Sequence, residues 1–290
     1  MSAESTAITR KSASNLALAF VLLPKPKRDA MSVLYAFCRQ VDDIADHPSE
    51  PVPVLRARLD AWRDEIRRAC EGRPVTFPVA RELQPVIARY RLPFDSFDQL
   101  IRGVEMDLDI NRYQTWQELE QYCHRVASVV GLLSVEIFGY QDPACRDYAV
   151  HLGKALQLTN ILRDVRADAE RGRIYIPQSE LRRHQVAPEE ILRCQYSDRF
   201  GRLAAAVAAE AKKYYALARQ TLPAADRRSM AAAELMGSVY WRLLEKLESR
   251  RFQVFGPVPT RLTKPQKALL VLRTWYRLLS NASAPNYGAA

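Results

Sequence analysis

The stretch LYAFCRQVDDIADHP, residues 34–48, combines the apolar periodicity of a half-buried helix with three aspartates in one turn. Asp42, Asp43 and Asp46 are like charges at neighbouring helical positions, where such charges repel each other. Aspartate is also a poor helix former. Nothing local offsets this cost, so the stretch predicts a partner for its acids, either elsewhere in the chain or in a ligand.

One face of this predicted helix gathers polar side chains. Tyr35, Arg39, Asp42 and Asp46 follow one another at positions i, i+4, i+7 and i+11, which places them in a single stripe. Asp43 points about 100° away from that stripe and fits it least. The helix is therefore predicted to turn Asp42 and Asp46 in the same direction.

A second stretch, QLTNILRDVRADAERGRIYIP at 157–177, repeats this arrangement. Gln157, Asn160, Asp164 and Asp168 fall at positions i, i+3, i+7 and i+11, so their oxygen-bearing side chains also form one stripe. Leucine, isoleucine and valine occupy the other directions and can be buried. The second stripe is the predicted partner of the first.

Two Asp-x-x-x-Asp pairs on separate helices predict a Mg²⁺ site between them. Carboxylates one turn apart suit a hard cation that prefers oxygen ligands, keeps several waters and binds a substrate phosphate as well. Helical bundles build such sites from inward carboxylates on facing helices. The alternative is two solvated faces, in which Arg39 near Asp42 and Arg163 beside Asp164 form weak surface ion pairs.

Composition indicates a helical protein and leaves its partner open. The 290 residues are 48% hydrophobic and include only 10 glycines, which favours helix over sheet. A net charge of +10 is typical of proteins that bind nucleic acid, anionic lipid or phosphorylated small molecules, although a solvated basic surface also explains it. Five cysteines without a CxxC pair argue against a disulfide framework or zinc knuckle and favour the cytoplasm.

Helical periodicity from end to end predicts one all-α domain over residues 1–290, with flexible tails at 1–11 and 281–290. No run of 18 or more apolar residues is present, so no membrane span is expected. The segment 174–176 alone resembles a strand. Helices are expected near 12–22, 27–46, 52–71, 78–90, 94–109, 115–139, 143–165, 188–193, 197–221, 225–250 and 264–280.

The stretch KALLVLRTWYRLL at 267–279 is apolar with Lys267, Arg273 and Arg277 interspersed. A basic amphipathic helix can rest on an anionic membrane. A terminal helix docked on the rest of the protein explains the pattern equally well. Peripheral contact with the inner face of the membrane is thus one of two expectations for this segment.

The two acidic stretches resemble the two aspartate-rich motifs of the squalene/phytoene synthase family. Between them, MDL at 106–108 and YCHRVASVVG at 122–131 are similar to two further signatures of that family, and the resemblance covers roughly 12–275. It implies a single-domain helical bundle of the isoprenoid synthase type with a central apolar cavity. It also implies Mg²⁺-dependent, head-to-head joining of two prenyl diphosphates.

The resemblance further implies a role for each site residue. Mg²⁺, or Mn²⁺ in its place, would bind Asp42 and Asp46 at one diphosphate, and Asn160, Asp164 and Asp168 at the other. The remaining residues would contact substrate: Asp43 and Gln157 near the diphosphates, Arg39 and Arg163 on them, Tyr35 and Tyr122 near the reacting carbons, and Tyr240 in the pocket.

The local sequence around these motifs most resembles the presqualene diphosphate synthase type. That type acts on two farnesyl diphosphates in squalene and hopanoid biosynthesis. The resemblance also implies that the protein would work beside other enzymes of squalene formation. A phytoene synthase acting on geranylgeranyl diphosphate and a full squalene synthase are the alternatives. NADPH is not expected for the first half-reaction. Leu132, Leu133, Val135 and Phe138 would either wall the prenyl tunnel and set chain length or belong to the ordinary core.

Two segments depart from the family pattern, and two other protein classes compete with it. SASNLALAF at 12–20 replaces an SFYxA-type stretch, and Gly256–Pro259 stands where a basic residue often follows the VF pair. A catalytically inactive assembly factor would be expected to lose the acids, which are intact here. A nucleic-acid binder would explain the charge but leave the acidic stripes without a purpose, so no nucleic-acid partner is expected.

Overall fold

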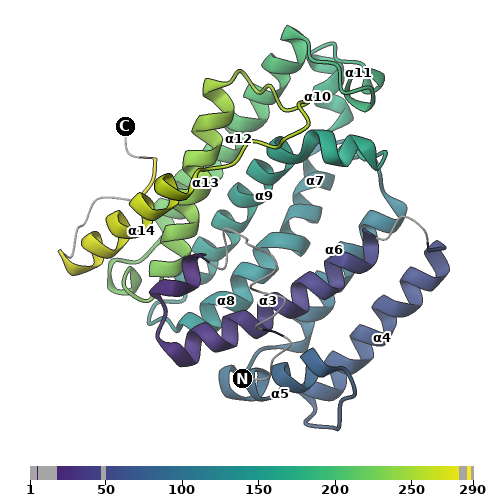
Figure 1. The fold of residues 1–290 in the computed structure, drawn as a ribbon. Coiled ribbons are helices and arrows are strands. Elements are labelled where there is room, and N and C mark those ends of the chain that lie inside the picture. Colours follow the sequence, from purple (N-terminus) through teal and green to yellow (C-terminus); the bar gives the residue numbers. More distant parts are fainter. Residues whose placement is uncertain (1–4, 6–17, 47–49, 281–285, 289–290) are drawn as a thin grey trace.

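The computed structural model describes residues 5, 18–46, 50–280 and 286–288. These residues are helical almost throughout and contain no strand, only a single bridge between Arg112 and Ile174, which confirms the all-α fold class. Figure 1 shows the helices gathered in one bundle. They are α3 (Lys25–Ala45), α4 (Val52–Cys70), α5 (Pro78–Tyr90), α6 (Phe94–Asp109), α7 (Trp116–Cys123), α8 (Val129–Phe138), α9 (Ala144–Glu170), α10 (Gln178–Arg183), α11 (Pro188–Leu192), α12 (Asp198–Thr221), α13 (Ala231–Ser249) and α14 (Lys264–Leu279).

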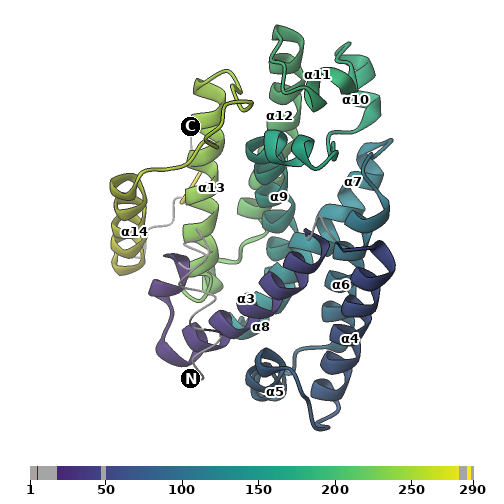
Figure 2. The ribbon, with the colours of Figure 1, turned by 45° about the vertical axis from the view of Figure 1, so that its right-hand side comes forward.

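Helix α9 is the central element of the bundle. It packs against α12 most extensively and also contacts α8, α11 and α13, whereas α3 contacts α4, α5, α6 and α8. Helix α8 therefore touches both helices that carry the acidic stretches. Helices α4 and α5 lie on the outer side of α3 and α6, and α14 lies on the outer side of α13 (Figures 1 and 2).

Helix α3 owes its position to its apolar faces. It begins directly after Pro24 and has Pro26 in its first turn, where proline's missing N–H costs nothing. Phe37 is fully buried, and its ring centroid lies 5.4 Å from those of both Trp62 on α4 and Phe97 on α6, edge to face. The polar stripe is thereby turned away from α4 and towards α9.

The predicted helix at 115–139 is interrupted by a π-helical turn at His124–Ser128, between α7 and α8. Two glycines let neighbouring helices approach this wider turn. A Cβ atom on Gly153 of α9 would lie 2.6 Å from the Ser128 Cα, and one on Gly103 of α6 would lie 2.7 Å from the Arg125 Cβ. Helices α6 and α9 therefore touch the π-turn at backbone distance.

The main further differences from prediction are two helix boundaries and one additional helix. Helix α9 continues past the predicted end at 165 to Glu170, where Arg166 and Glu170 pair one turn apart at 2.8 Å, and Gly172 with φ +74° ends it. Helix α10 was not predicted. Helix α13 begins only at Ala231, because Asp226 holds the preceding segment in a 3-10 turn by accepting hydrogen bonds from the backbone of the loop before α9.

Within the predicted C-terminal tail, the structure describes residues 286–288. Asn286 and Tyr287 are buried, and the Tyr287 ring centroid lies 5.5 Å from that of Tyr215. Ser5 is buried as well. Most of the predicted helix at 12–22 lies outside the described residues, and its last three residues form a 3-10 turn. Of the helices formed by the described residues, none combines the length and the apolar character needed to cross a bilayer.

Candidate active site

The two acidic stripes line one polar cavity of about 250 Å³. Asp42 enters it from α3 and Asp46 from the residue directly after that helix, and Asp164 and Asp168 enter it from α9. Asp107, near the end of α6, adds a fifth carboxylate. The predicted meeting of the two stripes is therefore present in the structure.

The surroundings of these acids disfavour their charged forms. Burial, with added repulsion from Asp107 and Asp46, raises the pKa of Asp42 to about 7, and Arg39 opposes that rise. Burial and the neighbouring Asp164 raise the pKa of Asp168 to about 7. Asp42 lies deep among protein atoms, yet its own surface opens onto the cavity, where water screens part of this effect. Such a cluster gains stability from a cation.

Three arginines line the same cavity as the acids: Arg39, Arg171 and Arg173. Arg173 is the most enclosed. Its Nη1 donates to Asp46 Oδ1 at 3.0 Å, and its Nη2 donates to the backbone oxygens of Ala45 at 3.0 Å and Asp107 at 3.2 Å. Arg171 lies 3.6 Å from the other oxygen of Asp46 and is more exposed. The first acidic stretch is therefore paired with basic residues that follow the second.

A tyrosine cluster holds Asp107. The hydroxyl groups of Tyr122 and Tyr175 donate to its two oxygens at 3.0 and 2.8 Å, and the two rings stack with centroids 5.1 Å apart. Burial comes first among the causes that raise the pKa values of both tyrosines, followed by the Asp107 charge. The two hydroxyl groups are therefore protonated donors.

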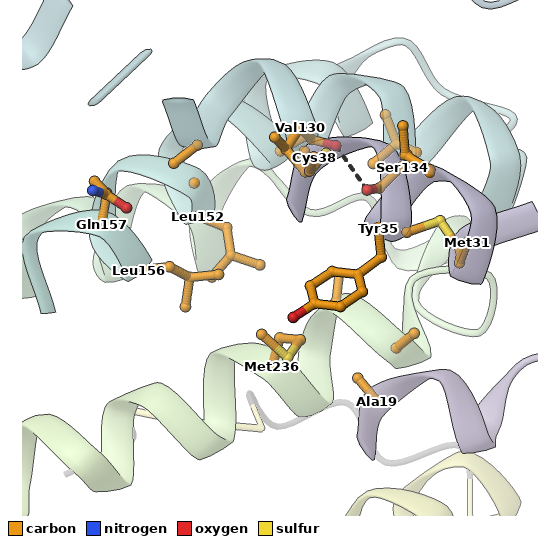
Figure 3. Close-up of a pocket in the computed structure, with 18 of the residues that line it drawn as sticks. Ala19, Met31, Tyr35, Cys38, Val130, Ser134, Leu152, Leu156, Gln157 and Met236 are labelled. Carbon is orange, nitrogen blue, oxygen red and sulfur yellow. Dashed lines mark hydrogen bonds between the residues drawn. The ribbon is translucent and has the colours of Figure 1, made fainter. Parts of the chain in front are cut away.

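An apolar cavity of about 270 Å³ adjoins the polar one. Asp42, Val126, Gln157 and Asn160 line both, so the two cavities lie side by side with a shared wall. Figure 3 shows Tyr35 extending into the apolar cavity, with its hydroxyl group directed between Leu156 and Met236. Most of the remaining wall is made of side chains from α3, α8, α9 and α13, including Met31, Leu34, Cys38, Val130, Leu152 and Tyr240.

The other predicted residues are placed less directly. Asp43 pairs with Arg39, their Oδ1 and Nη2 atoms 2.5 Å apart on an exposed side of α3, and it does not line the polar cavity. Arg163 does not line it either. Its Nε donates to Asp164 Oδ1 at 2.7 Å, and contacts with Asp164 and Tyr240 raise its pKa although burial acts to lower it. Arg163 thus orients Asp164 from behind.

Four polar residues of this cavity were not singled out from the sequence: Asp107, Arg171, Arg173 and Tyr175. Asp107 stands within the MDL signature, and the other three follow α9 within the second acidic stretch. Their position within motifs that resemble those of the family is the sequence feature that could have identified them as site residues. Helical periodicity could not reveal their direction, because residues 171–177 leave the helix and Asp107 lies on a third one.

The oxygen donors around the cavity fit a Mg²⁺ ion whose coordination shell is completed by water and substrate phosphate. No three His, Cys, Asp or Glu side chains of the described residues close on one point as a preformed metal centre. Five carboxylates and three guanidinium groups are instead spread around the cavity, a formal charge of −2 when all are ionised. Asn160 Oδ1 is buried without a hydrogen-bond partner. Spaced carboxylates and an amide oxygen suit an ion that keeps waters and binds phosphate.

Known proteins are similar to this chain in sequence and in architecture. The chain is 35% identical to presqualene diphosphate synthase of Rhodopseudomonas palustris, covering 90% of this chain and 92% of the relative. It is 34% identical to phytoene synthase of Arthrospira platensis, covering 87% and 86%. The crystal structure of a dehydrosqualene synthase superimposes with a TM-score of 0.85 at 28% identity over 95% of both chains.

The squalene synthase of Alicyclobacillus acidocaldarius superimposes with a TM-score of 0.77 at 29% identity, covering 86% of this chain and 93% of that one. The family model for squalene/phytoene synthases matches residues 9–267, which include both acidic stretches and every residue of the polar cavity. The chain therefore belongs to the squalene/phytoene synthase family.

Proposed function

We propose that the protein joins two farnesyl diphosphates head to head and forms presqualene diphosphate. One observation carries this proposal: the acidic stripes of α3 and α9 line a single polar cavity that adjoins an apolar one and shares four residues with it. A prenyl diphosphate has the same two parts, a multiply charged head and a greasy tail. An inactive assembly factor would need neither the assembled acids nor the apolar space behind them.

The polar cavity is the proposed diphosphate site. Asp42 and Asp46 would hold one Mg²⁺ or Mn²⁺, and Asn160, Asp164 and Asp168 would hold another. When bound, the metal neutralises charge on the diphosphate and improves it as a leaving group. The excess of carboxylates over guanidinium groups means that the protein alone would repel a diphosphate. Arg39, Arg171 and Arg173 supply the positive charge that the chain itself contributes.

The apolar cavity would hold the prenyl chains and exclude water during the reaction. The C1–O bond of one substrate breaks, and its electron pair leaves with the diphosphate. The double bond of the second substrate attacks the allylic cation, and loss of a proton closes a cyclopropane ring. Ring faces such as that of Tyr35 stabilise cations. Tyr122 and Tyr175 donate to Asp107, so the Tyr35 hydroxyl or the released diphosphate is the candidate proton acceptor.

Phytoene synthesis from geranylgeranyl diphosphate is the second candidate, because relatives with both names have nearly the same identity to this chain. The predicted chain-length residues divide between two environments. Val135 and Phe138 line the apolar cavity, whereas Leu132 and Leu133 do not. Leu133 is fully buried in the core. Val135 and Phe138 are thus the positions at which tail length would be selected.

Product analysis tests the proposal directly. The protein is incubated with Mg²⁺ and radiolabelled farnesyl or geranylgeranyl diphosphate, first without and then with NADPH. Presqualene diphosphate from farnesyl diphosphate, with or without NADPH, is the expected product. Phytoene would identify the second candidate, and squalene formed only with NADPH would identify a full squalene synthase. Absence of turnover with either substrate would contradict the enzymatic proposal.

Domain organisation and location complete the proposal. The described helices share one hydrophobic core from Ala19 to Tyr287, which supports a single functional unit. All five cysteines are free thiols, which supports a reducing compartment, namely the cytoplasm. A lipid-soluble product would pass to the next enzyme of squalene formation near the membrane.

A further inference from the structure

Helix α14 presents an apolar stripe to solvent. Its five large apolar residues on this side are each 54–68% exposed: Leu269, Leu272, Trp275, Tyr276 and Leu279. They recur at the spacing of one helical face. Most other large apolar side chains of the described residues are buried, so this concentration on one helix indicates a contact surface.

The orientation of α14 is fixed by contacts on its opposite side. Thr274 is buried there, and its hydroxyl oxygen accepts a hydrogen bond from Asn286 Nδ2 at 3.0 Å. Asn286 Nδ2 also lies 3.1 Å from the Glu234 backbone oxygen on α13, and its own backbone oxygen accepts from Ser238 at 3.2 Å. These hydrogen bonds hold the docked side of the helix against α13. The apolar stripe therefore faces away from the protein, as the outlying position of α14 in Figure 2 indicates.

Charge around the stripe is of one sign. After Glu248 the chain contains seven lysines and arginines and no aspartate or glutamate. On α14, Lys264 and Arg273 are exposed and lie on either flank of the apolar stripe by helical geometry. The pKa of Arg277 is lowered by burial and by the nearby Arg273, as expected where positive charge is crowded.

We propose that this stripe, Leu269 to Leu279 with the flanking Lys264 and Arg273, docks on the surface of an anionic phospholipid bilayer. Aromatic side chains with polar tips, here Trp275 and Tyr276, favour the boundary between headgroups and acyl chains. Long basic side chains reach the phosphates while their stems stay on apolar surface. A second copy of the chain would bring like charges together, whereas anionic lipid neutralises them.

The surface is close to the apolar cavity but separate from it. Helix α13 contributes Ala232, Ala233, Met236 and Tyr240 to the cavity wall, and α14 packs on α13. None of the residues of the stripe lines either cavity. Binding to lipid can therefore be measured without substrate, so its outcome is independent of the proposed reaction.

Co-sedimentation of the full chain with vesicles tests the proposal. Vesicles of phosphatidylglycerol mixed with phosphatidylcholine should bind the protein, pure phosphatidylcholine should bind it far less, and added salt should weaken binding. Leu272→Ser combined with Trp275→Ser should reduce binding at least about tenfold, because two anchors are lost. Lys264→Gln combined with Arg273→Gln should reduce it about fivefold for each charge removed.

Matched controls separate the surface from general effects. Val54→Ser removes an exposed apolar side chain from α4, and Arg182→Gln removes an exposed charge from α10; both should bind like the parent. Circular dichroism and thermal unfolding establish that each variant folds. Binding that is equal for the parent and the two α14 variants would overturn the proposal. The proposal would also be overturned if no vesicles bound the protein and sedimentation equilibrium showed a dimer that the Leu272→Ser and Trp275→Ser double variant no longer forms.

Discussion

Arg173 donates to Asp46 at 3.0 Å across 127 positions of the sequence. The same guanidinium group reaches the backbone oxygens of Ala45, the last residue of α3, and of Asp107, in the last turn of α6. Both oxygens lie where the carbonyl groups of a helix have no partner within it and carry partial negative charge. One side chain therefore fixes the ends of two helices and the position of a cavity acid.

Replacing Arg173 by glutamine should impair both folding and turnover. The variant leaves Asp46 and two helix-end carbonyl groups without their donor, which should lower the free energy of unfolding by about 2 kcal/mol. Turnover should fall at least about tenfold, with more Mg²⁺ needed for half-maximal rate, because Asp46 is no longer positioned. Urea denaturation and a Mg²⁺ titration of the rate measure the two effects.

Arg171→Gln is the matched control for Arg173→Gln. Arg171 is about half exposed and lies 3.6 Å from Asp46, so its loss should change stability by less than about 1 kcal/mol. Equal destabilisation by the two variants would contradict the positioning role of Arg173.

Neighbouring aspartates should differ sharply in their effect on turnover. Asp42→Asn removes a carboxylate from the cavity and should lower turnover at least about a hundredfold, as should Asp164→Asn, with the helical circular dichroism signal unchanged. Asp43→Asn removes only the exposed partner of Arg39 and should cost less than about tenfold. Equal losses at Asp42 and Asp43 would mean that total charge on α3, rather than the cavity, determines activity.

Metal-free protein should lose stability as the pH rises through about 7. The pKa values of Asp42 and Asp168 are raised to about 7 in the folded state and are near 4 in the unfolded chain. Their contribution is therefore fully present below pH 4 and is lost as the pH rises through 7. With EDTA present, the Tm should fall by a few degrees between pH 6 and 8.

Added Mg²⁺ should restore the Tm at pH 8 more than at pH 6, because it binds the ionised acids. The double variant Asp42→Asn with Asp168→Asn serves as the reference, since every other titrating group is common to it and the parent. The difference in Tm between parent and variant should depend on pH in the stated direction. A difference that is constant between pH 6 and 8 would show that these acids do not titrate as described.

The acidic pairs could be predicted from sequence because a helix turns regular spacing into direction. Asp42 on α3 with Asp46 directly after it, and Asp164 and Asp168 on α9, needed only the helical period to be placed on one face each. The meeting of the two faces was a hypothesis from residue chemistry and family resemblance. Its structural basis is packing: Phe37 turns α3 by locking between Trp62 and Phe97.

Residues outside regular helix could not be placed from spacing. Arg173 and Tyr175 follow Gly172, whose positive φ ends α9, and their direction depends on the bridge between Arg112 and Ile174. The π-turn at His124–Ser128 was equally hidden, because α8 after it is apolar on nearly every side and a shift in helical phase leaves no visible change in its pattern. The only sequence feature associated with the π-turn is the pair of glycines, Gly103 and Gly153, that pack against it from other helices.

Because α9 lies so close to the π-turn, replacing Gly153 by alanine should destabilise the protein, whereas such a change within a helix is usually stabilising. Gly→Ala inside a helix normally stabilises by up to about 1 kcal/mol. At Gly153 the new methyl group would lie 2.6 Å from the Ser128 Cα and 2.8 Å from its nitrogen, and both are backbone atoms that cannot rotate away. Gly153→Ala should therefore lower the free energy of unfolding by about 1–3 kcal/mol.

Gly256→Ala is the matched substitution, because a Cβ atom there meets nothing within 4 Å and the φ angle is not positive. That variant should be neutral or more stable by about 0.4–1 kcal/mol, since alanine restricts the unfolded chain. Urea denaturation of both variants gives the comparison. Gly153→Ala should also reduce turnover, because Gly153 itself lines the apolar cavity and α9 carries Asp164 and Asp168. Stabilisation by Gly153→Ala would mean that α9 and the π-turn lie further apart than the structure places them.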